Sequence, residues 1–296
     1  MNIERVKFAV AGTPVVGLLH RPESAPRAAL VLTGPLTSVK EQASGAYARA
    51  LAARGYAALA FDHRTFGESG GEPRQYESPP RKIEDILAAA DFLRGRDDTR
   101  ALPLAAVGIC AGGGYMAGAV AADPRLLAFA AVAGVFPDVQ AMRSMLGAKF
   151  DASIEAGRAA RLRFEAGAPA ERIPAVGEGD VAMPLAEAFA YYGTARGAVP
   201  NYTNSFAVQS REFTVPFDTM AAADRIRVPT LIVHSERALL PAWARQFYAR
   251  LQAPKRELWL ESVGQIDFYD DPKLIDAAAD AVAAHFDSAL PVRSST

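Results

Sequence analysis

Apolar and polar positions follow two successive patterns along the chain. Residues 5–10 and 14–20 alternate with a period of two, which predicts an opening β-hairpin. From residue 28 onward, short continuous apolar runs (AALVLTG, YAALAFD and LAAVGI) are separated by segments with helical periodicity. Buried strands that alternate with helices are typical of a parallel sheet. The pattern therefore predicts an α/β protein with a mostly parallel twisted sheet flanked by helices.

The expected helices differ in their surfaces. Residues 81–93 place apolar side chains on one face and charges on the other, so this helix is expected to pack one side on the sheet. The segment GGGYMAGAVAA, which follows LAAVGI, consists of small residues and is expected to form a central helix close to the strands. A further strand, LAFAAVAGVF, is expected to end near Pro137.

Regular alternation stops after Pro137 and resumes with VPTLIVHSE at Val228. The aromatic-rich segment between them is longer than an ordinary loop and contains helical patches. We expect residues 138–217 to be an inserted helical cap between two parts of one core, 1–137 and 218–288, with a tail at 289–296. Such an insert is suited to cover the carboxyl ends of the strands, where α/β sheets bind ligands. Its aromatic residues could equally form a small core of the insert itself.

Composition restricts the partners. The formal net charge of the 296 residues is −1, without a long run of like charge, which argues against a nucleic acid or a membrane surface as partner and favours a small-molecule substrate. No apolar stretch reaches the length of a membrane span or of a secretory signal, so a cytoplasmic protein is expected.

Cysteine and histidine are sparse. One cysteine excludes an internal disulfide, and the four histidines lack metal-ligand spacing, so neither a metal nor another cofactor is expected. The cap and the helix expected at 242–251 each offer an apolar face for a homodimer, although internal packing explains both.

The single cysteine stands in the tightest turn of the sequence. In GICAGGGYM, Cys110 lies between a predicted strand and a predicted helix, with glycines two residues before and after it. This G-x-nucleophile-x-G pattern predicts a nucleophile elbow, in which the backbone N–H of Ala111 serves an oxyanion hole. The helix N-terminus is expected to favour thiolate over thiol. A glycine-rich turn for packing or phosphate binding is the alternative, but the spacing of the dinucleotide and P-loop motifs is missing.

With these motifs the chain resembles the α/β-hydrolase superfamily, and within it bacterial dienelactone-hydrolase-like proteins with an inserted cap. The resemblance extends over most of the chain and rests on five stretches: GPLTSVKEQ, FDHRTFGESGGEPRQ, GICAGGGY, YYGTARGAVPNYTNSF and GQIDFYDDP. It implies a cysteine nucleophile and a second oxyanion donor at Leu36 or Thr37. It also implies that Asp62, Arg64 and Ser69 brace the surrounding loops.

The resemblance fails at the general base. Gln265 occupies the place of the family's histidine, and an amide cannot take a proton near neutral pH, which leaves it a positioning role. The family's aspartate is also missing, and Glu236 is the only carboxylate near its position. His63, at the end of the fourth strand, is the candidate to replace the base, whereas His234 fits a supporting role better. Glu41 is a weaker candidate helper.

Three functions are compatible with these residues. The first is a cysteine hydrolase or acyltransferase acting on an ester, lactone or thioester through Cys110. The second is a non-hydrolytic enzyme, such as a cyclase or lyase, and the third is a ligand-binding protein that uses the same capped pocket. Tyr191, Tyr192 and Tyr202 indicate an apolar or aromatic ligand with a polar tip.

Overall fold

The computed structural model describes residues 2–291 and contains one eight-stranded sheet in the order β1-β2-β4-β3-β5-β6-β9-β10. Strands β1 and β2 pair antiparallel with each other, β2 pairs antiparallel with β4, and the remaining neighbours are parallel. The strands are β1 (Asn2–Val10), β2 (Thr13–Arg21), β3 (Ala29–Thr33), β4 (Ala57–Phe61), β5 (Leu104–Ile109), β6 (Leu126–Val132), β9 (Thr230–His234) and β10 (Lys255–Trp259). The opening hairpin and the mostly parallel sheet are confirmed.

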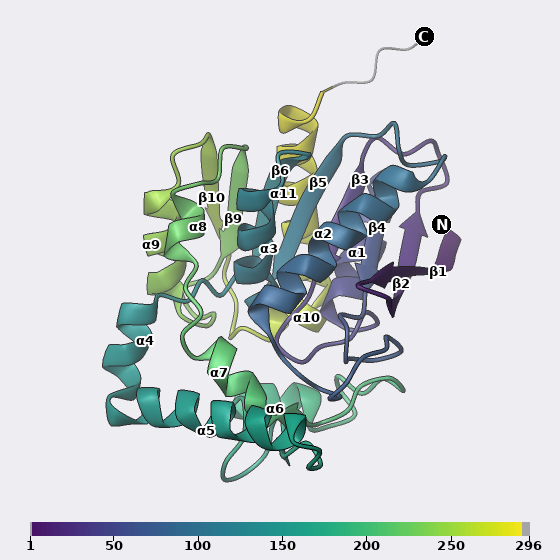
Figure 1. Ribbon diagram of the computed structural model, residues 1–296. Helices are drawn as coiled ribbons and strands as arrows, with labels where there is room; N and C mark the ends of the chain where they lie inside the picture. The colour runs from purple at the N-terminus through teal and green to yellow at the C-terminus, as the bar shows by residue number, and fades with distance from the viewer. Residues whose placement is uncertain (1, 292–296) are drawn as a thin grey trace.

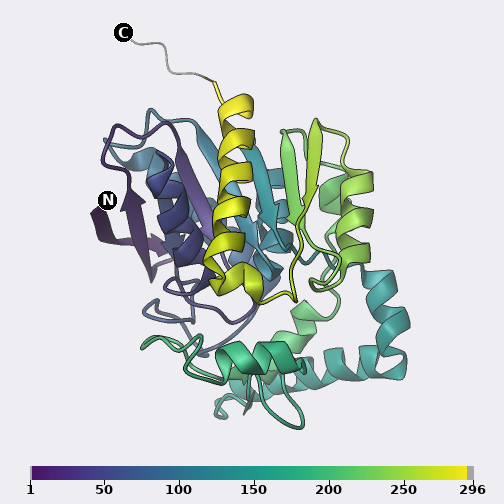
Figure 2. The same cartoon turned by 180° about the vertical axis from the view of Figure 1, so that it is seen from behind.

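Helices cover both faces of this sheet (Figures 1 and 2). One face carries α2 (Pro79–Gly95), α3 (Ala111–Ala122), α8 (Met220–Ala223) and α9 (Pro241–Arg250). The other carries α1 (Ala43–Ala53), α10 (Asp267–Asp270) and α11 (Pro272–Ala289). The chain therefore forms three layers with one hydrophobic cluster on each side of the sheet.

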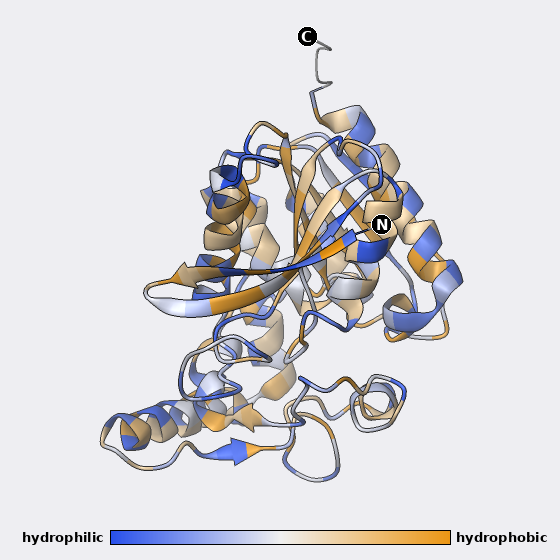
Figure 3. Cartoon of the chain, turned by 90° about the vertical axis from the view of Figure 1, so that its right-hand side faces the viewer, coloured by the Kyte–Doolittle hydropathy of each residue, from blue (hydrophilic) through white to orange (hydrophobic). Residues whose placement is uncertain are grey.

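The two clusters explain why the apolar runs form strands. Every residue of β3, β4 and β5 is buried, because side chains that alternate along each strand enter both clusters. Hydrophobic residues accordingly gather on the strands, and hydrophilic residues on the outer turns of the helices (Figure 3). Gly113 lets α3 lie close to the end of β6, because a Cβ there would stand 3.0 Å from the Cα of Gly134, just after β6, and 3.6 Å from the Cβ of Ala131 in β6.

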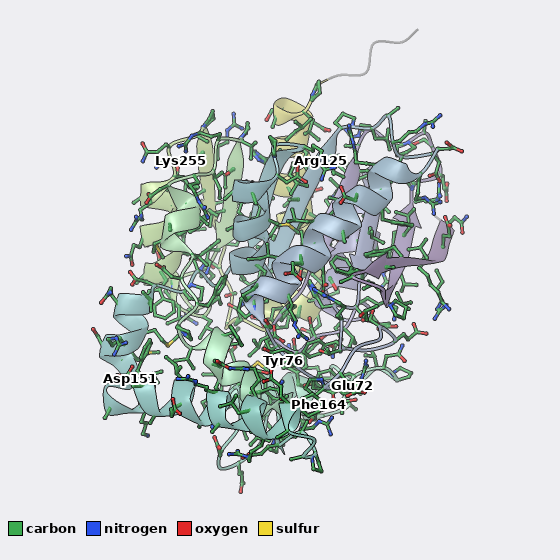
Figure 4. The ribbon with its side chains drawn as sticks, viewed as in Figure 1. Glu72, Tyr76, Arg125, Asp151, Phe164 and Lys255 are labelled. Atoms are coloured by element: carbon green, nitrogen blue, oxygen red, sulfur yellow. The ribbon has the colours of Figure 1, made fainter. Side chains whose placement is uncertain are left out.

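The segment after β6 forms a separate layer at one end of the sheet (Figure 1). Its elements are α4 (Val139–Leu146), α5 (Ala148–Glu165), β7 (Arg172–Ile173), α6 (Ala186–Tyr192), β8 (Phe206–Ala207), the short 3₁₀ helix η1 (Val208–Ser210) and α7 (Arg211–Thr214). In Figure 4, Tyr76 and Phe164 mark this end of the molecule, whereas Arg125 and Lys255 mark the opposite edge. Since Arg125 directly precedes β6 and Lys255 begins β10, this layer, called the cap below, covers the carboxyl ends of the parallel strands.

Two boundaries differ from expectation. Strand β6 ends at Val132 and not near Pro137, because the N–H of Val135 donates to the carbonyl of Cys110 at 2.8 Å and the chain turns toward the elbow. Helix α11 continues to Ala289, and residues 292–296 of the expected tail lie outside the described residues. Within residues 2–291, no helix has the length and apolar character needed to cross a membrane.

Candidate active site

Cys110 is the N-cap of α3 and adopts φ 54° and ψ −126°. This left-handed backbone is strained for a residue with a side chain and is typical of functional turns. A Cβ at Gly108 would lie 2.5 Å from the carbonyl oxygen of Gly112, and a Cβ at Gly112 would lie 2.5 Å from that of Thr33. Both glycines are therefore required by close backbone approach, as the elbow pattern implies.

The sulfur of Cys110 lies among four hydrogen-bond donors. These are the Tyr269 hydroxyl, the Gln265 side-chain amide and the backbone N–H groups of Ala111 and Leu36. Burial nevertheless raises the pKa of the thiol above its ordinary value, because the loss of water outweighs these hydrogen bonds. The N–H of Ala111 at the helix N-terminus lowers the pKa of the thiol, as expected, but burial of the sulfur outweighs this effect.

The loop after β3 distinguishes the two candidate oxyanion donors. Thr37 has φ 61°, and its N–H donates to Oε2 of Glu77 at 3.1 Å. The N–H of Leu36 points instead to the sulfur of Cys110. Glu77 is fully buried and is held by the ammonium of Lys82 at 2.5 Å and the hydroxyl of Tyr115 at 2.8 Å. A buried ion pair thus fixes the loop that presents Leu36.

A second buried charge cluster braces the same loop. Lys40 is fully buried, and its ammonium lies 2.8 Å from Asp62, 2.7 Å from Glu41 and 2.7 Å from Glu68. Asp62 also accepts the backbone N–H of Lys40 at 2.8 Å, and the Ser69 hydroxyl donates to the carbonyl of Asp62 at 2.6 Å. These contacts are structural, and Glu41 is engaged in them.

Gln265 is buried beside the elbow and uses both ends of its amide. Its Nε2 donates to the carbonyl of Ala133 at 2.9 Å and to the Tyr269 hydroxyl at 3.3 Å. Its Oε1 accepts the N–H of Leu239 at 2.9 Å. The side chain is thus held in one orientation beside the sulfur of Cys110.

A cavity of about 520 Å³ opens above Cys110, between the sheet and the cap. Most of its surface is apolar. The cap contributes Met142, Leu146, Val181, Met183 and Phe206 among others, and the core contributes Leu36, Ala111, Tyr115, Gln265 and Tyr269. Such a chamber suits a small, largely apolar ligand.

The three tyrosines predicted to bind substrate have different positions. Tyr192 lines the cavity, and its buried hydroxyl has no hydrogen-bond partner among the described residues. Tyr191 and Tyr202 pack on the ring of Tyr192, with ring centroids at 4.8 and 5.2 Å, and are not among the described residues that line the cavity. The hydroxyl of Tyr202 also has no partner among the described residues, so it is the cavity lining that singles out Tyr192, and the other two tyrosines support its ring.

His63 is not brought to the cavity. Its Nε2 lies 2.7 Å from the Thr33 hydroxyl and its Nδ1 lies 3.2 Å from Asp85, so both ring nitrogens are occupied. Burial also lowers the pKa of this imidazole. His234 is likewise enclosed, with its ring nitrogens 2.9 and 3.2 Å from the carbonyls of Ser235 and Gly134.

Glu236 is exposed and pairs with Arg245 outside the cavity. Together with the positions of His63 and His234, this leaves the predicted core of the site as Cys110, Ala111, Leu36 and Gln265. The structure brings these four residues together around one sulfur atom.

Among the residues that line the cavity, sequence reasoning missed two that are hydrogen-bonded to Gln265. Tyr269 follows Gln265 by four residues, a spacing that places two side chains on one side of a helical turn. That spacing could have identified it. Glu187 comes from the cap, and its Oε2 accepts the backbone N–H of Gln265 at 2.9 Å. No local pattern points to Glu187, because 78 residues separate the two partners.

Residues 24–261 match the family model Hydrolase_4, described as serine aminopeptidase, S33. The chain belongs to this α/β-hydrolase family. Protein YcjY of Escherichia coli K12 is 31% identical over 316 residues, which cover 98% of this chain and 100% of YcjY. The crystal structure of protein PA2218 from Pseudomonas aeruginosa matches with a TM-score of 0.86 and 28% identity, over 98% of this chain and 94% of that one.

Two further matches concern the resemblance more closely. A dienelactone hydrolase from Anabaena variabilis shares the fold of this Hydrolase_4 chain, with a TM-score of 0.61 and 15% identity over 98% of this chain and 99% of that one. The thiohydrolase aneE of Aspergillus aculeatus is 33% identical over 119 residues, 40% of this chain and 37% of aneE. The α/β-hydrolase fold is thereby confirmed. The family is described by a serine enzyme, whereas this Hydrolase_4 member carries Cys110 at the elbow.

Proposed function

We propose that the protein is an acyl-transferring hydrolase whose nucleophile is the thiol of Cys110 and whose substrate is an ester, lactone or thioester of a small apolar or aromatic molecule. The observation that carries this proposal is the position of the sulfur, which meets the N–H groups of Leu36 and Ala111 at the floor of an apolar cavity. Two preorganised N–H donors stabilise the oxyanion of a tetrahedral intermediate. In this arrangement the strained elbow serves to present the sulfur beside those donors.

The first step forms a thioester on the enzyme. The sulfur of Cys110 bonds to the acyl carbon, the bond from that carbon to the leaving oxygen or sulfur breaks, and the proton of the thiol passes to the leaving group. Because burial raises the pKa of the thiol, substrates with good leaving groups are favoured, and thioesters and activated esters are of this kind. The similarity to a protein named thiohydrolase supports a thioester.

Tyr269 assists this step. Its hydroxyl is hydrogen-bonded to the sulfur of Cys110 and also accepts a hydrogen bond from Gln265. Burial raises the pKa of this phenol well above its ordinary value, so Tyr269 acts as a donor to negative charge on sulfur and not as a base. Gln265 then acts by orienting Tyr269 and the sulfur.

The proposal is tested by rapid kinetics with p-nitrophenyl acetate and S-phenyl thioacetate on the wild type, Cys110→Ala and Cys110→Ser. We expect a burst of product in the wild type, one acetyl group added to the intact protein, and neither in Cys110→Ala. Cys110→Ser keeps a nucleophilic atom but ionises far less readily, so its burst should be strongly reduced. Equal bursts in all three proteins would refute the proposal.

A non-hydrolytic reaction is the second candidate. It is favoured by Gln265, which cannot accept a proton from water and so gives the elbow no histidine-like base. In that case the acyl group passes to a second nucleophile within the substrate, as in a cyclisation. Acylation of Cys110 without release of free acid from any of the substrates would favour this candidate.

A further inference from the structure

Glu187 brings a carboxylate from the cap to the loop where the family keeps its histidine. It lies in the first turn of α6 and lines the cavity. Its Oε2 accepts the backbone N–H of Gln265 at 2.9 Å. A Cβ at Gly264 would lie 2.3 Å from the same oxygen, so the missing side chain of Gly264 makes room for the carboxylate.

Of the described residues that line the cavity, two carry a carboxylate, Asp180 and Glu187. Asp180 is neutralised by an ion pair with Arg211. Glu187 has no cationic partner among the described residues, and its only hydrogen bond among them is the one to Oε2. Its second oxygen, Oε1, therefore has no hydrogen-bond partner among the described residues, and Glu187 lines the same cavity as Cys110.

We propose that Glu187 is the general base that activates water for hydrolysis of the acyl-Cys110 thioester. This inference rests on the proposed function, since it requires an acyl group on Cys110. A carboxylate can accept a proton from water, which the amide of Gln265 cannot do. The cap thus supplies the base that the loop after β10 lacks.

The step balances without another reactant. A water molecule gives one proton to Oε1 of Glu187, and its oxygen bonds to the acyl carbon. The resulting oxyanion is stabilised by the N–H groups of Leu36 and Ala111. The bond from carbon to sulfur then breaks, and the proton held by Glu187 returns to the sulfur, which restores the thiol and releases a carboxylic acid.

The bond from Gln265 to Glu187 also orients the base. The N–H donates to Oε2 and so fixes one edge of the carboxylate, and a Cβ at Gly264 would lie 3.9 Å from Oε1 against 2.3 Å from Oε2. Replacement by glutamine preserves this contact, because the amide oxygen can accept the same N–H. Glu187→Gln should therefore fold normally and lose only the proton-accepting group.

The experiment compares the wild type with Glu187→Gln and with a matched control, Glu261→Gln. Glu261 is an exposed carboxylate on the segment that leads to Gln265, and it does not line the cavity. Burst amplitude and burst rate report acylation of Cys110, and the steady-state rate reports deacylation. Intact-protein mass spectrometry follows the fraction of acetylated protein during turnover.

We expect Glu187→Gln to keep the burst while its steady-state rate falls about 10²-fold or more, the range of general-base catalysis. Acetyl-Cys110 should accumulate during turnover, and hydroxylamine, which attacks thioesters without a base, should restore release of the acyl group. Glu261→Gln should match the wild type. A Glu187→Gln protein that deacylates at the wild-type rate, or one whose burst is also lost, overturns the assignment.

The proposed function fails in a different way. If the wild type itself forms no Cys110 adduct, the nucleophile is wrong and the role of Glu187 falls with it. If the adduct forms and Glu187→Gln clears it normally, only the role of Glu187 is refuted.

Discussion

Restoring a histidine at position 265 is the sharpest perturbation of the site. The side chain of Gln265 lies beside the sulfur of Cys110, and the resemblance to dienelactone hydrolases implies a histidine base at this position. An imidazole there would take the proton of the thiol and form a thiolate–imidazolium pair. Gln265→His should therefore change the protonation state of the single cysteine.

The size of the effect follows from the environment of the sulfur. An ordinary thiol is a few per cent ionised at pH 7, and burial of Cys110 raises its pKa further. A neighbouring positive charge lowers the pKa of an acid by about 1–3 units, equivalent to about 1.4–4 kcal/mol. The substitution also has a cost in stability. The N–H of Leu239 loses the Oε1 of Gln265 as its acceptor, which should lower the free energy of unfolding by about 1–3 kcal/mol.

The assay is the ultraviolet absorbance of the thiolate as a function of pH, with Cys110→Ala as the blank. Because the chain has one cysteine, the difference reports Cys110 alone. We expect the midpoint of Gln265→His to fall by about 1–3 pH units. Gln265→Asn, whose shorter amide lies farther from the sulfur, should titrate at or above the wild-type midpoint, since Gln265 lowers the pKa of the thiol. An unchanged midpoint in Gln265→His would show that residue 265 does not reach the thiol.

Other predictions concern buried titratable groups. Lys40→Met leaves the carboxylate of Asp62 buried without its cation and should lower the free energy of unfolding by about 3–5 kcal/mol, measured by urea denaturation. The control, Lys7→Met, changes an exposed lysine and should have little effect. Equal losses in the two variants would contradict this prediction. Burial lowers the pKa of His20 from 6.5 to about 4, so between these pH values the unfolded state binds a proton that the folded state does not. The free energy of unfolding should therefore fall by about 3 kcal/mol as the pH is lowered from 6.5 to about 4. His20→Leu should abolish this part of the loss of stability at low pH. If the free energy of unfolding depends on pH in the same way in this variant, the role of His20 is refuted. Because the pKa of Cys110 is raised, its acylation rate should keep rising with pH beyond about 8.5, and a plateau near pH 7 would refute the raised pKa.

Much of the sheet could be predicted from the sequence, because each strand is marked by a continuous apolar run within a few neighbouring residues. The run LAAVGI coincides with β5, since its buried residues are bounded by a proline before it and the elbow after it. The interior of the cap could not be predicted in detail. Its strands β7 and β8 have two residues each, and its helices depend on contacts with distant segments.

The site shows the same division between local and distant effects. The role of Cys110 as an elbow residue follows from the local spacing of Gly108 and Gly112, although the carbonyl that Gly112 makes room for, that of Thr33, lies on another strand. The pKa of the Cys110 thiol does not follow from the local sequence, because burial of the sulfur depends on the cap and on the loop at Gln265 as well as on the helix N-terminus. The contact of Glu187 with Gln265 likewise exists only in the folded chain.

The central claim, that Cys110 is the nucleophile, is tested most directly by locating the acyl group. The protein is stopped with acid during turnover of S-phenyl thioacetate, digested, and analysed by peptide mass spectrometry. We predict acetylation on the peptide that contains residues 108–116, at Cys110, and its loss on treatment with hydroxylamine. An unmodified Cys110 together with continued turnover, or an acetyl group on another residue that turns over at the same rate, would contradict the claim.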